Sequence, residues 1–167
     1  MFCLDANVFM EAWNFTYPPR IFRPLWELIA VHADQMVLIR PVFEEIEPIS
    51  SSDRQLSREQ RAAKYPVRTW IEDTGFNIPD IDETVSNLSI RLERSYEIIP
   101  ESKGAGQVDI TLIAYAKIAG GIVVTMEAVQ HQAPAKRSNY KIPLVCSEEG
   151  VACIDFVQLL DAIGINM

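Results

Sequence analysis

Acidic residues recur beside the short apolar runs of this chain, and their side chains are the first candidates for chemistry. They are Asp5, Glu44 with Glu45, Asp109 and Glu127. Mg²⁺ and Mn²⁺ prefer oxygen ligands, and a cluster of carboxylates repels itself too strongly to stay ionised without a cation. If the fold brings these side chains together, the sequence predicts a site for one of these two ions.

Each acid also has a purely structural explanation. An Asp after a strand often caps the next helix, and a Glu or Asp in the first turn of a helix complements the helix dipole. The joint placement of the acids favours a functional cluster, because functional groups gather beyond the carboxyl ends of the strands in an open parallel sheet.

Short apolar runs and helical periodicities alternate along the chain. The runs 2–4, 36–39, 122–125 and 142–145 predict buried strands. Apolar spacing predicts helices over 8–14, 21–33, 42–46, 82–96, 107–119 and 156–163. This alternation predicts an α/β fold: a three-layer α/β/α sandwich with a mostly parallel twisted sheet. The helix 107–119 is apolar on most faces, so we expect it at the centre.

The length of 167 residues predicts a single domain over 1–167, with an inserted helical region at about 50–100. Within this region lie the clustered basic residues Arg54, Arg58, Arg61, Lys64 and Arg68, five of the fifteen in the chain. Since Arg pairs well with phosphate, Arg54, Arg58, Arg61 and Arg68 are candidates for RNA binding despite the net charge of −8. A solvated helix face is the open and more common alternative.

The composition sets limits on the class of protein. With 49% apolar and 23% charged residues, the chain is typical of a globular protein. It has no apolar run of membrane-spanning length and no signal-peptide pattern at its start, which predicts a cytoplasmic protein without a membrane partner. Three cysteines and two histidines argue against both a disulfide framework and a zinc site.

Four motifs of the chain resemble those of PIN-domain nucleases. Leu4-Asp5-Ala6-Asn7-Val8-Phe9 is similar to their Asp-x-Asn/Ser-x-Phe/Leu opening, and Pro41-Val42-Phe43-Glu44-Glu45-Ile46 to their second motif. The third is similar to Val108-Asp109-Ile110 with the residues that follow it, and the fourth to Val124-Thr125-Met126-Glu127. Lys141-Ile142-Pro143 with Cys146 resembles a little-characterised PIN-like subfamily.

The resemblance implies roles for individual residues. Asp5, Glu45, Asp109 and Glu127 would form an acidic tetrad holding one or two Mg²⁺ or Mn²⁺ ions. Asn7 would steady Asp5, and Thr125 would touch a metal-bound water. Glu45 is preferred to Glu44 because the acid of the family directly precedes an aliphatic residue. The fourth acid of the family is normally Asp, so Glu127 departs from the pattern.

The implied function is metal-dependent hydrolysis of RNA. Many small PIN proteins, the VapC-like toxin ribonucleases among them, belong to type II toxin–antitoxin pairs, so an antitoxin protein and a homodimer are implied partners. Two alternatives remain. A non-catalytic PIN-like module would bind RNA or protein, and a phosphohydrolase of the haloacid-dehalogenase type would need a second Asp where Asn7 stands, which disfavours it.

Overall fold

A four-stranded, all-parallel sheet forms the centre of the computed structural model, which describes residues 1–165. Its order is β2-β1-β3-β4, with β1 spanning Phe2–Leu4, β2 Met36–Val37, β3 Ile122–Val124 and β4 Cys153–Ile154. Cys3 stands opposite Val37 on one side and Val123 on the other. The first strand is therefore an inner strand, which explains why its three residues are buried and apolar.

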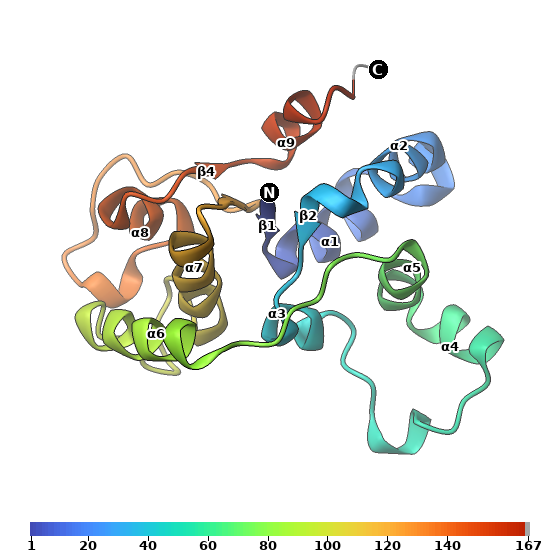
Figure 1. The fold of residues 1–167 in the computed structure, drawn as a ribbon, viewed down its shortest axis with the longest axis horizontal. Helices are drawn as coiled ribbons and strands as arrows, with labels where there is room; N and C mark the ends of the chain where they lie inside the picture. The colour runs from blue at the N-terminus through green and yellow to red at the C-terminus, as the bar shows by residue number, and fades with distance from the viewer. Residues whose placement is uncertain (166–167) are drawn as a thin grey trace.

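Helices flank this sheet on both sides, so the predicted α/β class is confirmed. In Figure 1, α6, α7 and α8 gather on one side of the strands and α1, α2 and α5 on the other. The bounds are α1 Ala6–Glu11, α2 Pro19–Val31, α3 Arg40–Glu45, α4 Arg58–Lys64, α5 Pro66–Thr74, α6 Glu83–Ser95, α7 Gln107–Ala119, α8 Ile142–Glu149 and α9 Phe156–Ala162.

The helix α7 is central, as its composition predicts. It packs against α3, α6, α8 and β3, and five of its apolar side chains are buried. It ends at Gly120, whose φ of 67° lies in the left-handed region that favours glycine. The packing contacts of α7 hold the helix against the sheet, and its first turn carries Asp109.

The strand predicted at 142–145 is wrong, because these residues begin α8. Pro143 lacks a backbone N–H and favours the first turn of a helix. The N–H of Ile142 donates to Glu127 Oε2 at 2.8 Å, and Gly150 ends the helix with a φ of 68°. The fourth strand is instead β4, whose two half-buried residues are too few to give a strand pattern.

The helix predicted at 21–33 begins slightly earlier, and a different face of it is buried. Pro24 lies inside α2, and Phe22 departs from helical dihedral angles, so the register of the apolar face changes there. Leu25, Trp26 and Ile29 are buried in the core. The side chain of Ile21, predicted to face that core, is 60% exposed.

An aromatic cluster joins α1 and α2 to α5. Neighbouring ring centroids in the cluster lie 4.8 to 6.4 Å apart, within the usual range for aromatic pairs. Its members are Phe9, Trp13, Trp26, Trp70 and Phe76. The three tryptophans lie in the hydrophobic core or pack against it, and the cluster fixes α5 to α1 and α2.

The region 50–100 contains the expected helices but also extends the sheet. After α5, Asn77 bridges to Val37, and the N–H groups of Leu38 and Arg40 donate to the carbonyls of Asn77 and Pro79, both at 2.9 Å. The segment 77–79 therefore covers the β2 edge. No helix among residues 1–165 is both long and apolar enough to cross a membrane.

Replacement of Gly104 by Ala should destabilise the fold. A Cβ at this position would clash with the backbone of Asn139 and Tyr140. We expect a loss of about 1 to 3 kcal/mol in the free energy of unfolding, measured by urea denaturation. Gly106→Ala is the matched control, since its Cβ would meet only Asp109 Oδ2, at 3.6 Å. Equal losses for the two variants would contradict this account of the loop.

Candidate functional site

The strand order places the carboxyl ends of β1 and β3 side by side. From β1 the chain runs to β2 on one side of it, and later returns through α7 to β3 on the other. Such a change of direction opens a crevice beyond the strand ends. Asp5 and Thr125 directly follow these two strands, and the N–H of Asp5 donates to the carbonyl of Val124 at 3.0 Å.

Asp5 is the buried centre of the site. The residue is only 2% exposed, and its Oδ2 accepts a hydrogen bond from Thr125 Oγ1 at 2.9 Å. Burial first, and then the negative charge of Asp109, raise the pKa of Asp5 from 3.8 to about 7. The hydroxyl of Thr125 and the backbone amide of Asn7 oppose this shift in pKa.

Asp109 lies between the other acids in the first turn of α7. Its Oδ2 accepts the N–H of Gly106 at 2.7 Å, so it also closes the start of its own helix. Burial, and then the charge of Glu127, raise the pKa of Asp109. Its own charge acts on Glu45, whose pKa is raised by partial desolvation and by Asp109 although the side chain is largely exposed.

Glu127 has a structural partner as well as a place in the cluster. Its Oε2 accepts the N–H of Ile142, the first residue of α8, and its own N–H donates to Thr125 Oγ1 at 3.1 Å. The charge of Glu127 acts on both Asp5 and Asp109. The carboxylate therefore caps α8 while adding negative charge to the crevice.

The structure places the two consecutive glutamates, Glu44 and Glu45, in different surroundings. Glu45 feels the charge of Asp109, whereas Glu44 lines a different pocket together with Arg54, Arg61 and Arg68. The effect of Asp109 on Glu45 associates Glu45 with the acid cluster, whereas Glu44 lies among the arginines.

Asn7 acts on Asp5 through its backbone, and Thr125 makes two hydrogen bonds within the protein. The side chain of Asn7 is exposed and lines a hollow beside Met10 and Asn14, so it is the Asn7 backbone that acts on Asp5. Thr125 is 1% exposed and bridges Asp5 and the backbone of Glu127.

The acids form an electrostatic cluster without the geometry of a finished metal centre. Among residues 1–165, no three His, Cys, Asp or Glu side chains are arranged to hold a metal ion. Asp5, Asp109 and Glu127 instead turn an oxygen toward an O–H or N–H of the protein. The donor set fits a hard divalent cation by its chemistry, since all four side chains offer carboxylate oxygens.

A hollow of about 310 Å³ opens beside the cluster at the ends of β3 and β4. Its polar lining includes Thr125, Glu127, Asp155 and Gln158. Like Asp5, Asp155 directly follows a strand of the parallel sheet, where functional groups gather. The sequence pattern does not predict this strand, β4, and so does not place Asp155 among the candidate site residues. Its Oδ1 caps α9 by accepting the N–H of Gln158 at 2.8 Å.

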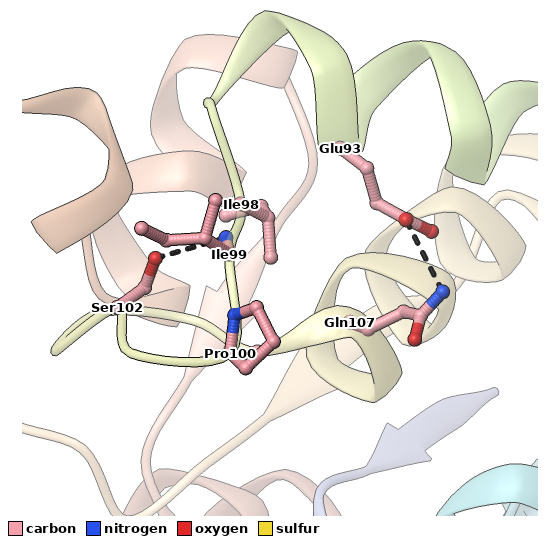
Figure 2. Close-up of a pocket in the computed structure, with 7 residues that line it drawn as sticks. Glu93, Ile98, Ile99, Pro100, Ser102 and Gln107 are labelled. Carbon is pink, nitrogen blue, oxygen red and sulfur yellow. Dashed lines mark hydrogen bonds between the residues drawn. The ribbon is translucent and has the colours of Figure 1, made fainter.

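A separate pocket of about 430 Å³ lies between the end of α6 and the start of α7 (Figure 2). Figure 2 shows its polar groups bonded to one another: Gln107 Nε2 donates to Glu93 Oε2, and Ser102 Oγ accepts the N–H of Ile99. None of the four clustered acids lines it. The crevice around Asp5 is therefore the stronger candidate site.

The buried carboxylate of Asp5 should make folding sensitive to pH. Because its pKa is raised on folding, the folded chain binds more protons between about pH 4 and pH 7, and stability falls as the pH rises through that window. We expect Asp5→Asn to raise the melting temperature at pH 8, and to raise it less at pH 5. The gain in the free energy of unfolding at pH 8 should be on the order of a few kcal/mol.

The exposed Asp34 provides the control substitution, Asp34→Asn, with thermal melting followed from pH 5 to pH 8. An Asp5→Asn protein that melts below wild type at pH 8 would show that the carboxylate itself stabilises the fold.

The chain belongs to the family described as "Domain of unknown function (DUF4411)", whose model matches residues 2–167. No curated protein matches the sequence.

Proposed function

We propose that this member of the DUF4411 family is a metal-dependent ribonuclease of the PIN type. The observation that carries the proposal is the burial of Asp5 at the crevice of a parallel sheet, with Asp109 and Glu127 acting on it. Like charges are costly to gather in a buried site, and a divalent cation offsets that cost. The four-motif resemblance to PIN-domain nucleases supports the same conclusion.

In this proposal Asp5, Glu45, Asp109 and Glu127 bind one or two Mg²⁺ or Mn²⁺ ions. These four carboxylates would hold the ion, which would supply the Lewis-acid chemistry for hydrolysis of a phosphodiester. Thr125 orients Asp5 through their hydrogen bond, and Gly106 orients Asp109 through its N–H. The hollow beside Glu127 offers room for a nucleotide next to the carboxylates.

The resemblance also carries the wider proposals of a cytoplasmic toxin, an antitoxin partner and a homodimer. A second candidate function is a non-catalytic module that binds RNA or protein. One observation favours that alternative: the carboxylates of Asp5, Asp109 and Glu127 each already accept a hydrogen bond from the protein.

Loss of either buried acid should abolish cleavage. We expect Asp5→Asn and Asp109→Asn to lower Mn²⁺-dependent cleavage of single-stranded RNA by more than the roughly 10- to 100-fold typical of outer-shell partners of a metal. Asp34→Asn is the control and should cleave as wild type does. Wild-type rates in both site variants would refute the assignment, and Mn²⁺ binding without any cleavage would favour the binding module.

The two neighbouring glutamates should differ in metal binding. Mn²⁺ should raise the melting temperature of the wild-type protein, because a ligand that binds the folded state stabilises it. Glu45→Gln should reduce this rise, since Glu45 lies in the field of Asp109, and Glu44→Gln should leave it unchanged. The reverse order of effects would place Glu44 in the site.

A further inference from the structure

Another pocket, of about 400 Å³, lies at the end of α3 opposite the helices α4 and α5. We call it the arginine pocket, and it is lined by Glu44, Pro48, Ile49, Arg54, Arg61 and Arg68. The three arginines come from different elements: the turn before α4, α4 itself and α5. The sequence predicted arginines close to one helical face that is interrupted at Pro66, and in the structure the three side chains reach the pocket from two helices and a turn.

Arg68 is held in place by the end of α3. Its guanidinium lies 4.1 Å from the ring centroid of Phe43, and its Nη1 donates to the carbonyls of Phe43 and Ile46, each at 3.3 Å. The side chain is only 14% exposed. Its buried Nε has no hydrogen-bond acceptor within the described chain, although Glu72 Oε1 forms an ion pair with it at 3.7 Å.

Arg61 repeats this unusual feature. Its Nε is also buried without an acceptor among residues 1–165. A buried N–H that lacks a partner is costly, and more so on a charged group, so two of them beside one pocket favour a site for an acceptor.

The remaining basic residues of the stretch are already neutralised. Arg58 pairs with Asp73 at 2.7 Å, and Lys64 pairs with Asp53 at 2.6 Å. Within the described residues, neither Arg54 nor Arg61 has a carboxylate within ion-pair distance. Arg68 pairs with Glu72 at 3.7 Å, so Arg54 and Arg61 are the two pocket arginines without an ion-pair partner among the described residues.

Charge and size together suggest the ligand. A phosphate monoester carries about −1.5 to −2 at neutral pH and can pair with both Arg54 and Arg61, whereas a phosphodiester carries a single charge. Guanidinium groups bind phosphate oxygens in pairs. The volume is within the range of small-ligand pockets, so a nucleoside attached to the phosphate has space against Pro48 and Ile49.

We propose that the arginine pocket binds the terminal phosphate monoester of a nucleic-acid strand. Glu44 in the pocket and Glu45 in the acid cluster are consecutive residues of α3, so a strand held by its end lies beside the carboxylates. The cleavage of that strand rests on the proposed function, but recognition of its end does not.

Binding in EDTA, where the proposed cleavage is blocked, tests the pocket alone. The probe is a fluorescent single-stranded RNA oligonucleotide, compared with a 5′-phosphate, with a 3′-phosphate and with hydroxyl groups at both ends. We expect one phosphorylated form to bind about tenfold more tightly than the hydroxyl form. Arg61→Ala and Arg54→Ala should remove that preference, while the control Arg91→Ala, on exposed α6 surface, should keep it.

Three outcomes would overturn the proposal: equal affinity for all three probes, loss of the preference in Arg91→Ala, or competition by inorganic phosphate that equals the phosphorylated RNA mole for mole. The last outcome would assign the pocket to the free ion. Arg68 is left unchanged because its contacts also stabilise α3. If the end preference holds but Mn²⁺ yields no cleavage, the pocket stands and the proposed function fails.

Discussion

The hydrogen bond from Thr125 to Asp5 joins two residues that are 120 positions apart and lie at the ends of adjacent inner strands. Because Asp5 is buried, this bond is one of the few interactions that keep its carboxylate tolerable in the core. Three helices around Asp5 are linked to the other acids. Helix α7 carries Asp109, α3 carries Glu45, and the first N–H of α8 donates to Glu127. The candidate acid cluster thus draws on residues from several elements around the inner strands.

The fold class could be predicted because most of its signals are local. Strand β1 is a wholly apolar run, and α7 has apolar residues on most faces and a glycine after its last turn. The strand predicted at 142–145 failed because a β-branched run does not distinguish a buried strand from a buried helix. Pro143 at the second position of that run was the available signal, and β4, two residues long, gave none.

The site was predictable where residues follow strands and unpredictable where tertiary contacts decide. Asp5 and Glu127 could be identified from their places in the sequence, but the choice between Glu44 and Glu45 depends on how α3 is rotated. The three arginines could be counted but not placed, since the fold at Pro66 and the contacts of Arg68 with α3 bring them together. Periodicity along one helix carries no information about such convergence.

The segment 77–79 beside β2 has a consequence for self-association. An open sheet can grow by adding a strand from another chain along an unpaired edge. Here the β2 edge is occupied by a short stretch that contains Pro79, which has no backbone N–H to offer to a further strand. At the opposite edge β4 is two residues long. Within residues 1–165, neither edge of the sheet therefore offers a long unpaired strand to which another chain could add.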